Sequence, residues 1–335
     1  MSAVQGASLL AVVEAGGEPA ARLLTRLEDR LAGQATGHGA LLARFAGETI
    51  SAGGKRLRPL LLFLAAGTPP PETESVLRAA VAVELVHSAT LVHDDVLDGS
   101  PLRRGRPTVV AAGGRLPATA TGDLLFSRAF AELAASRSVE AIRVLTRASS
   151  ELAAGELMQR ADAFRAVGVE RYLERCRLKT AVLFRAACEL GAVCGEDATG
   201  NGDWAGAGRV GALGAFGEQI GLAFQLLDDV LDVSGPPERT GKPQGADLLD
   251  GTVNLPLIIA RERDPELAAL DPRTVATPES AAAVCAQIIA TGALDEARAR
   301  ALEMVSRAKA QLPGLPAAQR AALELVADAV VERYM

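Results

Sequence analysis

Nearly every long segment of this sequence carries apolar residues at helical spacing, and this pattern limits the possible folds more than any other feature. Leu23, Leu27 and Leu31 fall on one face of a helix, and Leu145 and Leu152 belong to a similar pattern later in the chain. No strand–helix alternation is visible. Such helices bury their apolar stripes by packing on one another. We therefore predict an all-α fold, a large helical bundle around a central cavity.

Short clusters of glycine and proline mark the expected helix breaks. They lie at residues 67–72, 99–101, 195–208 and 234–245. A chain of 335 residues could form two domains or one large one. Because no low-complexity linker divides it, we predict a single all-α domain over residues 1–335. Its motif-bearing core covers about residues 40–260 and its C-terminal helices about residues 261–335.

Composition excludes several classes of function. Aromatic residues make up only 3% of the chain and the net charge is −6 without a basic tail, so we expect no nucleic-acid partner. The longest apolar run, residues 60–66, is too short to cross a bilayer, and the N-terminus lacks a basic leader. We expect no transmembrane segment. The four cysteines lack CxxC spacing, which favours buried free thiols and a cytoplasmic location: Cys176, Cys188, Cys194 and Cys285.

Two aspartate clusters stand at the ends of expected helices. They are "LVHDDVLD" at 91–98 and "QLLDDVLD" at 225–232, and glycine and proline follow each one. A helix C-terminus disfavours each carboxylate by up to about 1 kcal/mol. Asp94 and Asp98, four residues apart, also repel each other, as do Asp228 and Asp232. Stability does not explain this arrangement, whereas a bound cation would.

The residue type indicates which cation. Oxygen-only ligands favour a hard metal, and Mg²⁺ takes one or two carboxylates while leaving its other positions to water and phosphate. Two such clusters facing each other would hold a metal-bridged diphosphate. The alternative for a single DDxxD is an ordinary solvated helix end, because the motif is short. Two copies, each followed by a basic loop, favour the metal site.

Basic loops containing glycine accompany these clusters. They are "GGKRLRP" at 53–59, "LRRGRP" at 102–107 and "TGKPQG" at 240–245. Guanidinium groups suit diphosphate oxygens, and lysine adds a mobile point charge. Arginine-rich loops alone are usually exposed to solvent. Together with the aspartates, they predict two anion pockets, one bridged by metal and one lined by these bases: Lys55, Arg56, Arg58, Arg103, Arg104, Arg106 and Lys242.

The residues preceding each cluster extend the predicted site. His87 and Thr90 share a helix face with Asp94, and Ala89 lies beside it. Gln225 shares a face with Asp228 in the second helix. A lone histidine is normally a satisfied core residue. His87 has aspartates on the same face, so we expect a polar contact with substrate.

These motifs, in this order, resemble the trans-type isoprenyl diphosphate synthases, also called polyprenyl synthetases. The similarity runs from "GGKRLRPLLL" through "HSATLVHDDVLDGSPLRRGRPT" and "RLKTAVLFRAACELGA" to "LAFQLLDDVLD" and "GKPQGADLLDGTVNLPL", over roughly residues 40–260. The resemblance implies an isoprenoid-synthase fold, usually as a homodimer. It also implies Mg²⁺-dependent head-to-tail condensation of isopentenyl diphosphate with an allylic diphosphate, giving a trans-polyprenyl diphosphate.

The resemblance further implies roles for individual residues. Mg²⁺ ligands would be Asp94, Asp98 and Asp228, and residues that ligate or orient metal-bound waters would be Asp95, Asp229 and Asp232. The allylic diphosphate would be held by Arg103, Lys179 and Lys242, with Thr180 and Gln225 nearby. Isopentenyl diphosphate would be held by Lys55, Arg58, His87 and Arg104. The family uses the released diphosphate as base, so no protein general base is expected.

Product length depends, by the same resemblance, on the residues four and five positions before the first aspartate. Bulky aromatics there block the tunnel, but this chain has Thr90 and Ala89. Small residues predict a medium or long product. The alternatives are a short-chain synthase making geranylgeranyl or farnesyl diphosphate, a class I terpene cyclase, and a non-catalytic subunit. The intact second motif argues against the last two.

Overall fold

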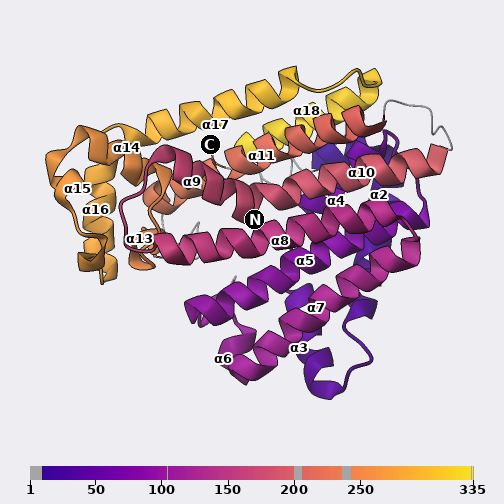
Figure 1. The fold of residues 1–335 in the computed structure, drawn as a ribbon, viewed down its shortest axis with the longest axis horizontal. Coiled ribbons are helices and arrows are strands. Elements are labelled where there is room, and N and C mark those ends of the chain that lie inside the picture. The colour runs from indigo at the N-terminus through magenta and orange to yellow at the C-terminus, as the bar shows by residue number, and fades with distance from the viewer. Residues whose placement is uncertain (1–9, 104, 200–205, 236–242, 333, 335) are drawn as a thin grey trace. The chain divides into compact units, whose positions relative to one another are not determined.

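The computed structural model describes residues 10–103, 105–199, 206–235, 243–332 and 334 (Figure 1). In these ranges the chain is mostly helical, and the described strands are two pairs of residues, β1 (Leu102–Arg103) and β2 (Arg106–Pro107), in an antiparallel hairpin. The all-α prediction is confirmed. The chain divides into two compact units, one of residues 1–149, 183–217 and 312–326, the other of residues 150–182, 218–311 and 327–335. The single-domain organisation stays a prediction.

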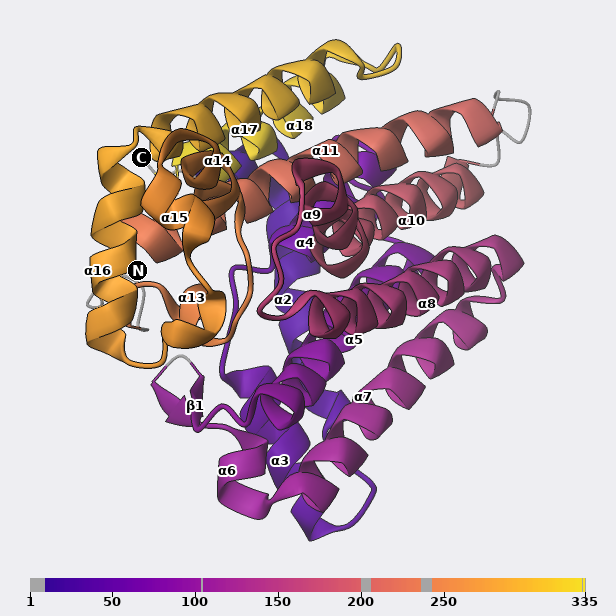
Figure 2. The same cartoon turned by 60° about the vertical axis from the view of Figure 1, so that its left-hand side comes forward.

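The first unit is built around α4, which is apolar on all sides. Every residue of this helix from Pro59 onward is buried, as expected for a helix without a polar face. Helices α5 and α7 run side by side in both views (Figures 1 and 2). The complete helices of this unit are α2 (Gly17–Gln34), α3 (Ala40–Ser51), α4 (Leu57–Ala66), α5 (Glu74–Asp98), α6 (Val109–Gly113) and α7 (Arg115–Ser136).

The second unit contains most of the C-terminal half of the chain, and Figure 2 shows its orange helices together. Helix α14 is its hub, in contact with α9, α15, α16 and α17. The complete elements are α9 (Val169–Cys176), the π-helix η1 (Arg177–Ala181), α13 (Ala246–Leu249), α14 (Leu255–Arg263), α15 (Pro265–Ala269), the 3₁₀-helix η2 (Pro272–Thr274), α16 (Pro278–Ala290) and α17 (Ala293–Ala310). The boundaries between the units fall inside α8 (Val139–Asp162), α10 (Val182–Thr199), α11 (Gly206–Ser234) and α18 (Ala317–Glu332), and between α17 and α18.

Two glycines that look like helix breakers serve packing instead. The break predicted at residues 195–208 begins too early, because α10 continues to Thr199. A Cβ at Gly191 would lie 2.3 Å from the Leu62 carbonyl oxygen, and one at Gly195 would lie 2.3 Å from the Ala66 carbonyl oxygen. The missing side chains therefore let α10 approach the α4 backbone. The predicted break begins with Gly195, whose role is steric instead.

Both aspartate clusters end helices, as predicted. Helix α5 ends at Asp98, and Gly99 follows in the left-handed region at φ +63°, with its N–H bonded to the Asp95 carbonyl. Helix α11 ends at Ser234, two residues beyond Asp232. The carboxylates thus occupy last helical turns, where the helix dipole disfavours negative charge.

Two helices are long and apolar enough to cross a bilayer by length and composition. These are α5 and the segment 208–234 of α11, whose most apolar stretches are 72% and 56% buried inside the protein. Polar and charged residues interrupt both helices, so neither contains an unbroken apolar run long enough to indicate a span from the sequence. Buried core helices of soluble proteins meet the same criterion, so the absence of a transmembrane segment stays a prediction. All four cysteines are buried and free, as expected.

Candidate active site

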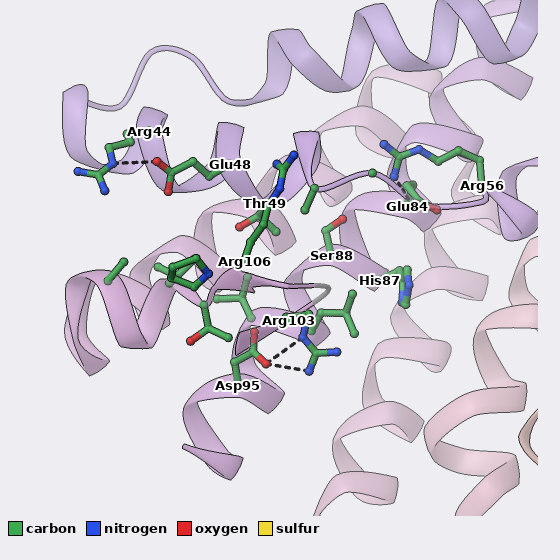
Figure 3. A pocket seen from close by; sticks show the side chains of 18 residues that line it. Arg44, Glu48, Thr49, Arg56, Glu84, His87, Ser88, Asp95, Arg103 and Arg106 are labelled. Carbon is green, nitrogen blue, oxygen red and sulfur yellow. Dashed lines mark hydrogen bonds and ion pairs between the residues drawn. The ribbon is translucent and has the colours of Figure 1, made fainter. Parts of the chain in front are cut away.

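The carboxylates of the first aspartate motif differ in burial. Asp94 is half-buried and Asp98 is exposed, but Asp95 is only 4% exposed. Arg103, on the hairpin after α5, donates from Nε to the Asp95 Oδ1 at 2.8 Å, and its Nη2 lies 2.7 Å from the same oxygen (Figure 3). The middle aspartate therefore positions the arginine that follows the motif.

A cavity of about 360 Å³ lies beside this pair, within the first unit. The predicted site residues that line it are Arg56, His87, Asp95, Arg103 and Arg106 (Figure 3). Lys55 and Arg58 do not belong to its lining, and the Arg58 guanidinium lies 4.6 Å from the centroid of the Phe184 ring. The structure thus brings together part of the predicted diphosphate-binding set.

Arg56, from the predicted basic loop, is a structural residue. It is 8% exposed, and it donates to Glu28 and to Glu84, each at 2.6 Å, and to the Ile50 carbonyl at 3.3 Å. Glu84 is itself 4% exposed, so neither partner can exchange this ion pair for water. Arg56 is therefore held inside the first unit, at the wall of the cavity.

The carboxylates of the second aspartate motif differ in burial in the same way. Asp228 is exposed and Asp232 is half-buried, whereas Asp229 is 2% exposed. Its Oδ2 accepts from the Tyr172 hydroxyl at 2.7 Å and from the Leu255 N–H at 3.3 Å. Burial raises the pKa of Asp229 to about 7, helped by the charge of Asp247 and opposed by the hydrogen bond from Tyr172.

The π-helix η1 carries two further predicted residues toward this motif. Thr180 donates to Gln225 Oε1 at 2.7 Å, and Gln225 Nε2 donates to Asp229 Oδ1 at 2.8 Å. Lys179 Nζ lies 2.5 Å from Glu156 Oε2. A diphosphate would therefore compete with Glu156 for this lysine. The structure brings together Thr180, Gln225 and Asp229 as a single hydrogen-bonded chain.

Three residues near the second motif were missed by sequence reasoning. The chain has only two tyrosines, and both donate to this motif: Tyr172 to Asp229, and Tyr334 to Asp228 Oδ1 at 3.0 Å. The Asp247 N–H donates to Asp232 Oδ2 at 3.3 Å. The signal available in the sequence was, for the tyrosines, that the chain has only two of them. For Asp247, it was the position inside "GKPQGADLLDGTVNLPL", a segment that resembles the family.

The remaining predicted residues have separate outcomes. Arg104 and Lys242 lie outside the described residues. Ala89 has no exposed surface, while Thr90 is half-buried and its hydroxyl donates to the His87 carbonyl at 2.8 Å. The roles of the predicted site residues in metal binding, substrate binding and chain length stay predictions.

The carboxylates of the two motifs fit a hard cation whose coordination is completed by water and by substrate phosphate. Within the described ranges, no three histidine, cysteine, aspartate or glutamate side chains are grouped to enclose a metal ion. Each motif instead offers two outer carboxylates, in its last helical turns. Mg²⁺ keeps several waters and binds through one or two carboxylates together with substrate phosphates, so this donor set suits it.

Comparisons with known proteins agree with this geometry. Residues 40–291 match the polyprenyl synthetase family. The chain is 39% identical to heptaprenyl diphosphate synthase component 2 of Geobacillus stearothermophilus, covering 80% of this chain and 82% of that protein. It is 36% identical to geranylgeranyl diphosphate synthase of Methanosarcina mazei, covering 85% and 87%. The crystal structure of a polyprenyl synthase from Caulobacter crescentus, complexed with calcium and isoprenyl diphosphate, superposes with a TM-score of 0.88 at 36% identity, covering 96% of this chain and 98% of that one.

The matched family covers most of the chain, and the structural likeness extends over almost all of it. The isoprenoid-synthase fold predicted from the motifs is confirmed. The chain therefore belongs to the polyprenyl synthetase family and is a prenyltransferase.

Proposed function

We propose that this prenyltransferase joins isopentenyl diphosphate to an allylic diphosphate, head to tail, with Mg²⁺ as its cofactor. The division of each aspartate motif carries the proposal. The middle carboxylates, Asp95 and Asp229, are buried and bonded to protein donors, while the outer ones stay at more accessible positions. Mg²⁺ would be held by Asp94, Asp98 and Asp228. When bound, it would stabilise the negative charge that develops on the departing diphosphate.

The chain's own residues would bind and orient the substrates. Asp95 engages Nε and Nη2 of Arg103, and a guanidinium has five N–H donors, so further donors can face a phosphate. His87 and Arg106 line the same cavity, which we assign to isopentenyl diphosphate. The family resemblance adds Lys55, Arg58 and Arg104 for this substrate. It adds Lys179 and Lys242 for the allylic diphosphate.

The test is a chain-extension assay with isopentenyl diphosphate, an allylic primer and Mg²⁺. We expect chelation of the metal to abolish extension, and Asp94→Ala or Asp228→Ala to lower kcat at least about a hundredfold, since each removes stabilisation of the leaving group. Asp29→Ala is the matched control, because Asp29 is an exposed aspartate on α2. Full extension in the presence of chelator, or in both site variants, would contradict the proposal.

We further propose a medium or long product. Thr90 and Ala89 are small, and one relative named above is a heptaprenyl diphosphate synthase component, whereas the geranylgeranyl diphosphate synthase represents the short-chain alternative. Because Ala89 has no exposed surface, a phenylalanine there would displace its neighbours, so Thr90→Phe is the cleaner variant for shortening the product. Chromatography of the products decides the length. A wild-type product of fifteen or twenty carbons would support the short-chain alternative instead, and release of a hydrocarbon from the primer alone would indicate a terpene cyclase.

A homodimer and a cytoplasmic location complete the proposal. The homodimer follows from the family resemblance. Light scattering after gel filtration tests it, and mixing experiments test for a second component, because one relative is named as a component. The buried, free cysteines support a reducing compartment. Cell fractionation tests the location.

A further inference from the structure

A continuous chain of hydrogen bonds connects α9, α11 and the π-helix in the second unit. The Tyr172 hydroxyl donates to Asp229 Oδ2 at 2.7 Å, and Gln225 Nε2 donates to Asp229 Oδ1 at 2.8 Å. Thr180 donates to Gln225 Oε1 at 2.7 Å. Tyr172 is 1% exposed and Asp229 is 2% exposed, so water does not reach this end of the series of hydrogen bonds. The Leu255 N–H adds a third donor to Asp229, at 3.3 Å.

The buried carboxylate of Asp229 fixes which group donates and which accepts in each of these hydrogen bonds. Both oxygens of Asp229 accept hydrogen bonds from protein donors, and the Gln225 amide presents its nitrogen, not its oxygen, to this carboxyl group. The amide oxygen must then face Thr180, whose hydroxyl hydrogen is committed to it. Thr180 can still accept a hydrogen bond but cannot donate one to an anion. The second N–H of the Gln225 amide is the donor that this arrangement leaves for a ligand.

The backbone around Thr180 is built to keep this arrangement. Residues Arg177–Ala181 form a π-helix, and the N–H of Val182 reaches back to the Arg177 carbonyl. Gly155 of α8 makes room for it, since a Cβ there would lie 2.7 Å from the Lys179 backbone nitrogen. The widened turn and the hydrogen-bonded chain therefore specify one position for the Thr180 and Gln225 side chains.

We propose that Tyr172 is a positioning residue for prenyl transfer: through Asp229 it fixes the orientation of the Gln225 amide, whose remaining N–H then donates to the diphosphate. This inference rests on the proposed function, in which the diphosphate binds beside the second motif. Such a donor is preorganised, because its partners hold it before the substrate arrives, and it stabilises the charge of the departing diphosphate without reorganisation.

The alternative is that Tyr172 only joins α9 to α11. Tyr172→Phe separates the two roles, because it keeps the ring, over which the Arg175 guanidinium lies 5.6 Å from the centroid, and removes only the hydroxyl donor. A residue that acts through Gln225 loses its effect when Gln225 is absent. A residue that acts on stability alone has the same effect in either background.

The experiment is a double-mutant cycle of Tyr172→Phe and Gln225→Met in the full-length chain. Two quantities are measured: kcat and KM for extension, and the affinity for inorganic pyrophosphate with Mg²⁺ by calorimetry. In the wild-type background we expect Tyr172→Phe to lower kcat/KM and pyrophosphate affinity about tenfold, the effect of one hydrogen bond to a charged group. In the Gln225→Met background we expect less than about a twofold change.

Two further variants serve as controls. Tyr334→Phe removes the chain's other tyrosine hydroxyl, which donates to Asp228 and not to Asp229, so its effect should be equal in both backgrounds. Asp229→Asn is an isosteric second probe, because its amide lets Gln225 turn either way, and it should lower pyrophosphate affinity only when Gln225 is present. Asp162→Asn is its matched control: Asp162 is likewise buried, at 4% exposure, and has an arginine partner, Arg171.

The outcomes separate this inference from the proposed function. Extension of the primer and binding of pyrophosphate by the wild-type enzyme support the proposed function. If Tyr172→Phe then has equal effects in both backgrounds, or no effect in either, the positioning role alone is refuted. If the wild-type enzyme neither extends the primer nor binds pyrophosphate with Mg²⁺, both fail. Should Tyr172→Phe not fold, the Asp229→Asn pair decides by the same criterion.

Discussion

Replacement of Arg56 by alanine should destabilise the protein instead of weakening substrate binding directly. The sequence places Arg56 in a basic loop suited to a diphosphate, but the structure pairs it with Glu84, whose side chain is 5% exposed. Removing one partner of a buried ion pair leaves an uncompensated charge and costs about 3–5 kcal/mol. The second pair adds at most about 1 kcal/mol, because the Glu28 side chain is 52% exposed. We therefore expect Arg56→Ala to lower the free energy of unfolding by about 3–6 kcal/mol.

Urea unfolding followed by circular dichroism measures this loss. Arg44→Ala is the control, because Arg44 lines the same cavity with a side chain 58% exposed, and its pair with Glu48 should contribute less than about 1 kcal/mol. The double variant Arg56→Met/Glu84→Leu removes both charges and should recover most of the stability. The reasoning is refuted if Arg56→Ala unfolds like the wild type while its KM for isopentenyl diphosphate rises.

Three more outcomes follow from the same structure. Burial raises the pKa of the Cys188 thiol above its ordinary value near 9, so this thiol ionises in the unfolded chain first and stability is lost as the pH rises past 9. Between pH 8 and 10, the free energy of unfolding of Cys188→Ala should therefore fall by about 1 kcal/mol less than that of the wild type, and an equal fall would contradict this. Gly191→Ala should destabilise by about 1–3 kcal/mol in thermal or urea unfolding because its Cβ meets the α4 backbone, while Gly211→Ala, with no atom within 4 Å, should be neutral or stabilising. Arg103→Lys should lower kcat/KM about tenfold in the extension assay, because an ammonium cannot repeat the two N–H contacts with Asp95, and unchanged kinetics would exclude a positioning role for this pair.

Much of the candidate site was predictable because its signals are local. Helical periodicity and the glycine after Asp98 placed the first motif in the last turn of a helix, and the structure has α5 ending there. The spacing of the motifs indicated the polyprenyl synthetase family, and the matching family covers residues 40–291. The helix end depends on neighbours within a few residues, and the family match depends on short motifs whose order is visible along the chain.

The sequence by itself therefore determined the all-α class, the positions of both aspartate motifs and the family. The tertiary structure alone decided which aspartate of each motif is buried, that Arg56 is an internal ion-pair residue, and that Gly195 is a packing contact. The physical reason is that burial and hydrogen bonding are set by residues far away in the chain: Tyr172 lies 57 residues before Asp229, and Glu84 lies 28 residues after Arg56. A helical pattern shows which residues share a face, but only packing decides what that face meets.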